Sequence, residues 1–356
     1  MRIQQTGLLL HDEARATPGF TLFSPIVHDQ VYLLNMAGDP VHQWEVRGNE
    51  YGYAYLLPNG NLLASSLPDD EAETDREGPH HLVELDWDSN VVWQIDAPGW
   101  HHDFFRLPNG NTAYIGFERM TDEAAARVQG GLPGSEVDGE YILGDYFREL
   151  TPEGETVWEY HCQSDMEIEK FPLEPFTARQ EFAHANSIFY TKDDRYLISF
   201  RRSSILIMID RATKEIVWSG NEPHWGGQHD AQILENGNLL LFANGFKTRG
   251  PALPFSQVVE MDLETGEDVW SYTGSPPWSF NSPHISGCQR LASGNTLICE
   301  GVWGRIFEVT PGGDIVWEYI SPHEGWIGRG NGVGNWVFRA LRYAEDSTHI
   351  GGRVRL

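Results

Sequence analysis

The sequence predicts an all-β fold, a six-bladed β-propeller with four-stranded blades, and two repeated hairpin patterns support this prediction. The first pattern is an apolar strand, a short turn and a second apolar strand that contains a tryptophan, and its copies end at Trp44, Trp93, Trp158, Trp218, Trp270 and Trp317. The second is an apolar strand, Leu-Pro-Asn-Gly-Asn or a variant of it, and another apolar strand, with turns at 57–61, 107–111, 234–238 and 291–295. Repeats of about 50 residues made of short strands are typical of propeller blades.

The turn residues explain each hairpin. Asn-Gly, Pro-Glu-Gly and Thr-Gly supply the positive φ angles of tight turns, and alternating β-branched and aromatic residues flank them. The repeated tryptophans are expected to pack between blades. Long amphipathic helical patterns are absent, and the best short helix candidate begins at Asp122 and ends at Gln129.

The order of the two hairpins predicts the strand order of a blade, with the Asn-Gly hairpin as the inner pair and the tryptophan hairpin as the outer pair. Five blades are continuous, at about 51–97, 101–160, 183–219, 228–272 and 283–319. We expect a composite sixth blade, with its inner strand at 336–343 and the remaining strands at about 18–46, because joining both termini removes exposed sheet edges. The chain is therefore expected to be one propeller domain, residues 1–356.

The composition excludes several classes of partner. Asp and Glu number 52 against 25 Lys and Arg, so the net charge of −27 disfavours binding to nucleic acid and to anionic membranes. Only four basic residues are lysines, a surface that suits a salt-rich, halophilic environment. A small aromatic or anionic substrate is the expected partner, and its charge must be met locally. The sequence leaves the oligomeric state open.

Three cysteines without a CxxC pair indicate neither a disulfide framework nor a zinc knuckle.

No apolar run approaches 18 residues, so no membrane-spanning helix is expected. The first twenty residues lack the pattern of a secretory signal, which predicts a cytoplasmic protein. Export after removal of a leader is the alternative.

One face of the propeller is expected to carry all the long connections between strands. These lie at 67–80, 117–146, 161–183, 245–255, 273–283 and 320–333, and the insertions 117–146 and 161–183 are the longest. Long loops on a rigid scaffold are where binding sites usually form. The same face receives the start of every inner strand.

Histidines stand at the start of four consecutive inner strands. They occur in His101-His102-Asp103, in His184-Ala185-Asn186-Ser187, in Gln228-His229-Asp230 and in Ser282-Pro283-His284, and His102 and His229 hold equivalent positions before the turn motif. Blade one offers Tyr51 or Tyr53 at this place, and blade six offers Asn331 or Asn335. Four imidazoles aimed at one channel mouth predict a functional cluster.

Charged residues accompany this cluster. Asp103 and Asp230 follow histidines directly, and because neighbours in a strand point to opposite faces, we expect each to bond the backbone of an adjacent blade. Arg201 and Arg202 end the second strand of blade three, and we expect one of them to face the histidines and supply positive charge.

These motifs together resemble the arylsulfotransferase-like propeller family. The resemblance rests on His-His-Asp before Leu-Pro-Asn-Gly-Asn, His184-Ala-Asn-Ser with Arg201, Gln228-His-Asp-Ala, Ser282-Pro-His-Ile-Ser-Gly and the final strand Val337-Phe-Arg-Ala-Leu-Arg-Tyr343. It covers nearly the whole chain.

The resemblance implies a transferase that moves a sulfuryl group from an aryl sulfate to a phenol without a nucleotide donor. By position, His229 would be the nucleophile, His102 the acid and base at the phenolic oxygens, and His184, Asn186 and Arg201 would bind the sulfate oxygens. His284 would complete the catalytic set, while Tyr53, His101 and Arg202 are further candidates for substrate binding. No cofactor is implied.

A different class of function remains open from the residues themselves. His102, His184, His229 and His284 are also a candidate set of ligands for one transition-metal ion, because neutral imidazoles suit iron, zinc, copper and manganese. Such a centre would serve a metal-dependent lyase or oxygenase. A non-catalytic binding propeller is the third interpretation.

Overall fold

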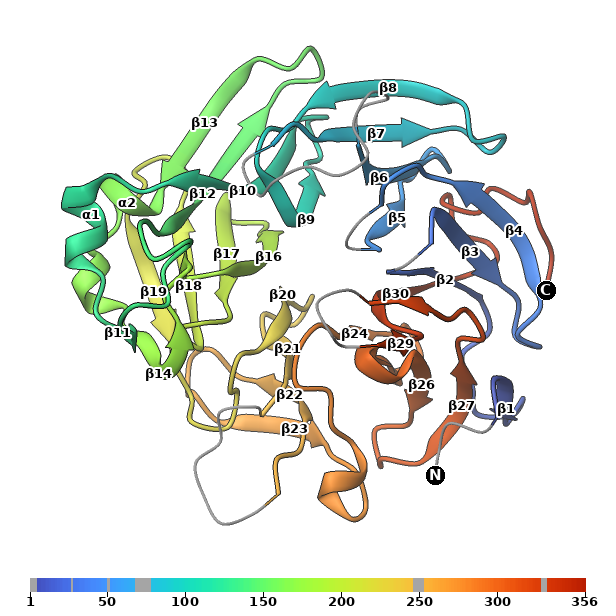
Figure 1. Ribbon diagram of the computed structural model, residues 1–356. Coiled ribbons are helices and arrows are strands. Elements are labelled where there is room, and N and C mark those ends of the chain that lie inside the picture. The colour runs from blue at the N-terminus through green and yellow to red at the C-terminus, as the bar shows by residue number, and fades with distance from the viewer. Residues whose placement is uncertain (1–4, 27, 50–51, 68–77, 246–252, 328–331) are drawn as a thin grey trace.

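The computed structural model describes residues 5–26, 28–49, 52–67, 78–245, 253–327 and 332–356. Its strands form six small antiparallel sheets arranged as the blades of a propeller around a common centre (Figure 1). The predicted all-β, six-bladed fold is confirmed. In the described part of the chain, no helix is long and apolar enough to cross a membrane.

Five blades follow the chain in order, and each has the predicted inner and outer hairpins. Blade one contains β5 (Ala54–Leu56), β6 (Leu62–Ser66), β7 (His81–Leu85) and β8 (Val91–Asp96), and blade two contains β9 (Trp100–Arg106), β10 (Thr112–Arg119), β12 (Leu143–Leu150) and β13 (Thr156–His161). Blade three contains β16 (Ala185–Tyr190), β17 (Arg195–Phe200), β18 (Ile205–Asp210) and β19 (Ile216–Gly220). Blade four contains β20 (His229–Ile233), β21 (Leu239–Ala243), β22 (Gln257–Met261) and β23 (Asp268–Tyr272), and blade five contains β24 (Gly287–Arg290), β25 (Thr296–Glu300), β26 (Arg305–Val309) and β27 (Ile315–Ile320).

Both ends of the chain build the sixth blade, as the sequence predicts. Its order is β30 (Val337–Tyr343), β2 (Phe20–Pro25), β3 (Gln30–Leu34) and β4 (Pro40–Glu45). A further strand, β1 (Gly7–His11), was not expected, and it pairs with the outer edge of blade five at β27. Two separate pairings of the N-terminal segment therefore join blades five and six.

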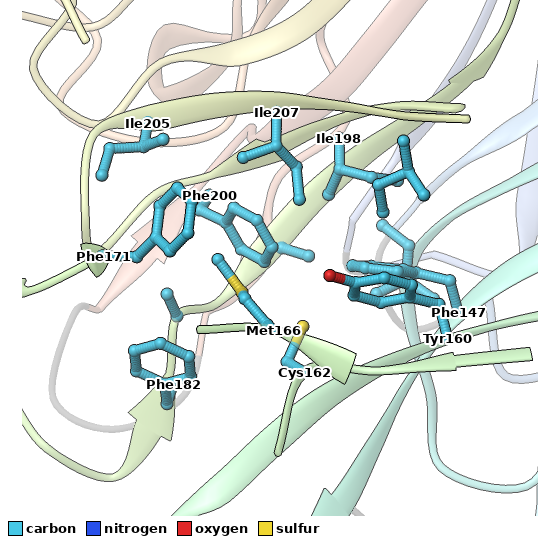
Figure 2. Packing of buried hydrophobic residues seen from close by; sticks show 14 of the residues in the cluster. Phe147, Tyr160, Cys162, Met166, Phe171, Phe182, Ile198, Phe200, Ile205 and Ile207 are labelled. Atoms are coloured by element: carbon cyan, nitrogen blue, oxygen red, sulfur yellow. The ribbon is translucent and has the colours of Figure 1, made fainter. Parts of the chain in front are cut away.

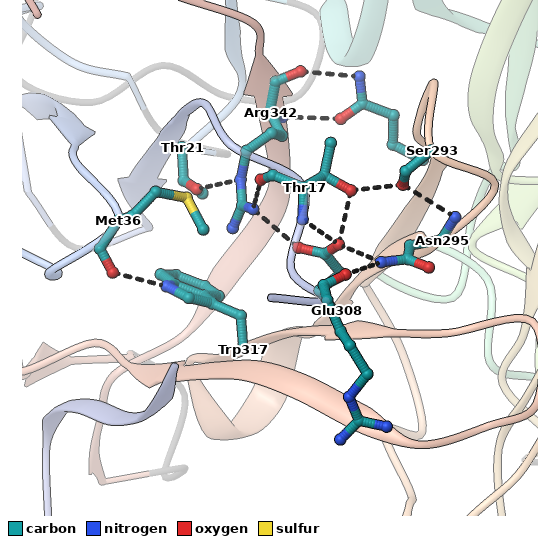
Figure 3. Close-up of polar contacts among 10 residues, drawn as sticks. Thr17, Thr21, Met36, Ser293, Asn295, Glu308, Trp317 and Arg342 are labelled. Atoms are coloured by element: carbon teal, nitrogen blue, oxygen red, sulfur yellow. Dashed lines mark hydrogen bonds and ion pairs between the residues drawn. The ribbon is translucent and has the colours of Figure 1, made fainter. Parts of the chain in front are cut away.

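A buried ion pair lies at this junction (Figure 3). Arg342 on β30 donates to Glu308 on β26 at 2.8 Å and to the Thr21 hydroxyl at 2.9 Å. The other oxygen of the Glu308 carboxylate accepts from Asn295 at 2.7 Å and from the backbone N–H of Thr17 at 2.7 Å. Because removing either partner would leave a buried charge without its counterpart, the two residues depend on each other in the folded protein. The pair joins both termini to blade five.

The repeated tryptophans join neighbouring blades through their indole N–H groups as well as by packing. Each of five indoles donates to a backbone carbonyl in the outer turn of the following blade: Trp44 to Asp86, Trp93 to Pro152, Trp158 to Arg211, Trp270 to Pro311 and Trp317 to Met36. The repeat thus places one contact of the same kind at successive blade interfaces, which explains why tryptophan recurs at the end of the outer hairpin.

The longest insertions fold against blades two and three. They contain α1 (Asp122–Arg127), β11 (Gly130–Leu132), α2 (Cys162–Asp165), the short 3-10 helix η2 (Ile168–Lys170), β14 (Leu173–Ala178) and β15 (Glu181–Phe182). The helix candidate at 122–129 is therefore present, though shorter. Side chains from this region, such as Met166 and Phe171, enter the core cluster between the two blades (Figure 2).

The first insertion is shorter than the predicted 117–146. The β10–β12 ladder continues to the pair Arg119 and Leu143, because the hydrogen-bonded register of the hairpin runs on past the expected strand ends. In the second insertion, which follows β13, β15 pairs in parallel with the first residues of β12, and this places Glu181 beside blade two. The remaining short elements are η3 (Pro277–Ser279), η4 (Gly301–Trp303), β28 (Gly325–Trp326) and β29 (Val333–Gly334). All three cysteines, Cys162, Cys288 and Cys299, are buried and free of disulfides.

Candidate active site

The inner strands begin in an irregular backbone that places the histidines. His102 and His184 have φ angles of 61° and 63°, and Asp230 has a φ of 53°. These are left-handed conformations that bulky residues rarely adopt, and the strand pairing shifts register at the same places. Backbone strain of this kind is concentrated at functional sites in proteins. At these strand starts, the side chains therefore do not alternate between the two faces of the sheet as they do in a regular strand.

His101, His102 and His184 form one contact series. The rings of His102 and His184 meet edge-on with centroids 4.6 Å apart, and the Nδ1 atoms of His101 and His102 are 2.8 Å apart. The His101 ring stacks on Phe117, with its Nε2 atom 3.1 Å from an oxygen of the buried Asp145. Phe117 and Asp145 thus hold the His101 ring in place, and its Nδ1 atom contacts that of His102.

Asp145 and Glu181 are site residues that sequence reasoning missed. Asp145 accepts backbone hydrogen bonds from Ala183 at 2.8 Å and Ala185 at 3.0 Å, on the two sides of His184. Glu181 bonds to Nδ1 of His184. Both carboxylates lie in segments that the sequence describes only as insertions, so no repeat marks them.

The structure separates the roles of the two arginines. Arg202 lies 2.7 Å from the Glu181 carboxylate and donates to the carbonyl of Ala178 on β14, so it ties the insertion to the site. Burial lowers the pKa values of His102, His184, His229 and His284, and the charge of Arg201 lowers all four further, while the charge of Arg202 adds to the effect at His184. Arg201 therefore lies within electrostatic range of the histidines of all four blades.

His229 is held by a network that defines its proton. Its Nδ1 atom lies 2.7 Å from Oδ1 of Asn244, while the amide nitrogen of Asn244 donates to the carbonyls of Ser282 at 2.8 Å and Ile285 at 3.0 Å. Because the Asn244 amide nitrogen is used as a donor, its oxygen must accept, and Nδ1 of His229 carries the proton. The lone pair is then on Nε2. Asn244 directly follows β21 and was missed, since an asparagine after an apolar strand has no distinctive signal.

The remaining predicted residues lie around this centre in different ways. His284 meets Trp336 edge-on at 4.6 Å. The amide of Asn186 donates to the backbone carbonyl of Gln228 at 2.7 Å. Tyr53 is buried under the guanidinium of Arg339 at 4.6 Å. Tyr51 and Asn331 lie outside the described residues, and Asn335 donates to the Ser321 carbonyl at 2.9 Å.

Asp103 and Asp230 belong to a second cluster next to the histidines. As expected, each bonds the backbone of an adjacent blade: Asp103 accepts from Ile188 at 2.9 Å and Asp230 from Cys288 at 2.8 Å. Both also pair with the buried Arg339 of β30, at 3.0 and 3.1 Å. Arg339 was quoted only as part of the final strand motif, and its ion pairs could not be read from the sequence.

Burial keeps the histidines uncharged at neutral pH. It lowers the pKa values of His102, His184 and His229 well below 6.5, and nearby positive charges lower them further. The pKa of His284 falls to about 4, first through burial and then through Arg201. Burial and the neighbouring Arg202 lower the pKa of Arg201 to about 10, so it stays cationic. Neutral imidazoles therefore lie within electrostatic range of the Arg201 cation, an arrangement that suits an anionic substrate.

The described residues also bear on the metal-binding hypothesis. Within these ranges, no group of three or more His, Cys, Asp and Glu side chains is arranged to hold a metal ion. The histidines instead contact carboxylates, an amide and one another.

Comparisons with known proteins bear on the family and the fold. The family model described as Arylsulfotransferase (ASST) matches residues 67–322. No curated protein matches the chain. Among solved structures, a protein of unknown function from Bacteroides caccae is similar, with 14% identity, a TM-score of 0.57 and coverage of 92% of this chain and 99% of that chain. A streptogramin B lyase structure gives 12% identity, a TM-score of 0.49 and coverage of 96% of each chain.

Proposed function

Since the chain belongs to the arylsulfotransferase family, we propose that it transfers a sulfuryl group from an aryl sulfate to a phenol through a covalent intermediate on His229. The observation that favours this reaction is the tautomer of His229. Asn244 holds the proton on Nδ1 and leaves the lone pair on Nε2, in a ring kept neutral by burial beside Arg201. A neutral imidazole with an oriented lone pair is a competent nucleophile.

The first half of the proposed reaction forms the intermediate. Nε2 of His229 attacks the sulfur of the donor, the bond between sulfur and the aryl oxygen breaks, and the phenolate leaves with the electron pair. The guanidinium of Arg201, together with the second amide N–H of Asn186, binds the sulfate oxygens. Neutral His184 directs its one N–H at Glu181 and so has none to donate to the sulfate. A fixed cation at the transferring group stabilises the charge that develops in the transition state.

The second half returns the enzyme to its starting state. The acceptor phenol gives its proton to His102, its oxygen attacks the sulfur, and the bond between nitrogen and sulfur breaks. His102 then releases this proton to solvent, from which the phenolate released in the first half takes up one proton, so that no proton is gained or lost over the cycle. His101 lies against Nδ1 of His102 and orients the ring for this role.

The test combines turnover with trapping. His229→Ala is expected to abolish transfer from 4-nitrophenyl sulfate to phenol, and incubation with donor alone should add the mass of one SO₃ group to wild type and none to the variant. His11→Ala, on the outermost strand β1, is the matched control and should behave as wild type. A wild-type protein that carries a stoichiometric metal ion and leaves aryl sulfates intact would favour the four-histidine metal centre instead. A metal-free, inert wild type would favour a binding propeller.

A further inference from the structure

Phe176 is an exposed aromatic residue at the rim of the candidate active site. Its side chain is 86% exposed and its φ is 67°. A phenylalanine gains nothing from solvent and pays a steric cost in the left-handed region, so neither local stability nor folding explains this placement. Among the residues that the model describes, the other strongly exposed aromatic side chains are Trp278, Trp303 and Trp326, and all lie on connections of the same face.

The segment that carries Phe176 is anchored on both sides. Glu174 donates its backbone N–H to the carbonyl of Arg202 at 2.8 Å, and the Arg202 guanidinium donates to the carbonyl of Ala178. β14 also pairs with β11, and the register of that pair breaks between its two ends, where Phe176 lies. The backbone of this segment is thus anchored on both sides of Phe176, and the Phe176 ring extends from it into solvent.

The Phe176 ring and the two arginines of the site line one cavity of about 210 Å³. Its other lining residues are Thr177, Ala178, Gly227 and Pro283. The cavity therefore has an aromatic wall and a guanidinium wall. An aryl sulfate has the same two parts, an apolar ring and an anionic head.

We propose that Phe176 binds the aryl ring of the sulfate donor by stacking while Arg201 holds the sulfate group. The proposal rests on the proposed function for the identity of the ligand. It assigns Phe176 the selection of aryl over alkyl sulfates, whereas Arg201 attracts both. Aromatic ring pairs favour offset or edge-on contact, which an exposed ring on a fixed backbone can offer without rearrangement.

The test uses an inert probe, so that it is independent of turnover. 2-Naphthalenesulfonate carries an aryl ring and an anionic head, but its carbon–sulfur bond does not transfer. In isothermal titration, Phe176→Ala should weaken its binding about three- to tenfold, the range that one aromatic contact contributes. Phe176→Trp should retain wild-type affinity, and methanesulfonate, which has no ring, should bind equally to all three proteins.

Two controls separate stacking from unfolding and from a general aromatic effect. Phe176→Gly suits the positive φ, so it should match or exceed the wild-type melting temperature while losing the same affinity as the alanine variant. Trp326→Ala removes a ring that is 68% exposed on the same face but does not line the cavity, and it should leave the affinity unchanged.

Several outcomes would overturn the assignment of Phe176. These are unchanged binding in Phe176→Ala, an equal loss in Trp326→Ala, an equal loss for methanesulfonate, or a change only in the oligomeric state, which would make Phe176 part of a contact between chains. If 2-naphthalenesulfonate binds through Phe176 but no aryl sulfate is turned over, the proposed transfer fails while the aryl-binding role of Phe176 stands.

Discussion

The charges of Arg339 and Arg201 both reach His229, yet their surroundings shift the pKa values of the two arginines in opposite directions. Burial lowers the pKa of Arg339, but the charges of Asp103 and Asp230 outweigh it and raise that pKa. For Arg201, burial and the charge of Arg202 act together and lower the pKa to about 10. The pKa of Arg339 is thus governed by carboxylates of the protein, whereas the pKa of Arg201 is governed by burial and by a second cation.

The difference separates a structural cluster from a reactive one within a few residues of the same strands. Asp103 and Asp230 follow His102 and His229 directly, so the inner strands of blades two and four contribute to both clusters. The arginine–aspartate cluster links blades two, four and six through Arg339. The histidine cluster rests on this link, which keeps the imidazoles in place without using their reactive nitrogen atoms.

The largest effect on stability is expected from Arg339→Met. Removing one partner of a buried ion pair leaves buried charge without its counterpart, which costs about 3–5 kcal/mol. The free energy of unfolding, measured by urea denaturation, should fall by that amount. A loss below about 1 kcal/mol would show that Arg339 does not join the blades and would remove the contrast with Arg201.

Arg201→Met should impair catalysis without lowering stability, the reverse of what is expected for Arg339→Met. Loss of a cation at the transferring sulfuryl group should lower kcat for aryl sulfate transfer by about 10²–10³-fold, or about 2.7–4 kcal/mol. The melting temperature should stay the same or rise, because burial disfavours this charge. Steady-state kinetics and calorimetry on the same sample check both parts. A large drop in melting temperature would place Arg201 among the structural arginines.

Acid should destabilise the folded protein through its buried histidines, at a pH at which ordinary proteins are still stable. The pKa values of the buried histidines lie below 6.5 in the folded state, so the unfolded chain binds more protons as the pH falls. Stability is therefore fully present above about pH 6.5 and declines toward pH 4, by at most about 1.4 kcal/mol per pH unit for each histidine.

Asp103 opposes this trend, because burial raises its pKa to about 6 despite the charge of Arg339. The contribution of protonated Asp103 to the stability of the folded protein is lost as the pH rises through that value. Because three histidines outweigh it, the melting temperature should be lower at pH 5 than at pH 7. The drop should be smaller in His229→Gln, which cannot take up a proton. An equal drop in both proteins would mean that His229 does not titrate in this range.

Salt should have the smallest effect and should act outside both clusters. At a net charge of −27, the acidic side chains on the surface repel one another, and dissolved ions screen that repulsion. The melting temperature is expected to rise by a few degrees between about 0.05 and 1 M sodium chloride. The Arg339→Met variant should show the same slope, because a buried pair is screened little. A flat curve would argue against a salt-rich origin.

Much of the site could be predicted because it follows from repeats. His102 and His229 stand at equivalent places before the same turn motif, and that equivalence alone brings them to one channel mouth. The turns themselves are local: Gly110 and Gly237 have φ angles of 92° and 89°, which the Asn-Gly dipeptides predict. Closure by the two termini also followed, because an incomplete blade leaves an edge that must pair.

What the sequence by itself determined is therefore the blade pattern, the ring closure and the positions of the histidines, since each depends on strand alternation, turn chemistry and repetition along the chain. Only the tertiary structure decided that Arg202 pairs with Glu181, that Asn244 orients His229, and that Arg339 joins Asp103 and Asp230. These contacts unite residues as far apart as positions 103 and 339, and they depend on left-handed strand starts that break the regular alternation of side chains. No local pattern records which side chains meet across a channel, because that depends on how six blades are set around it.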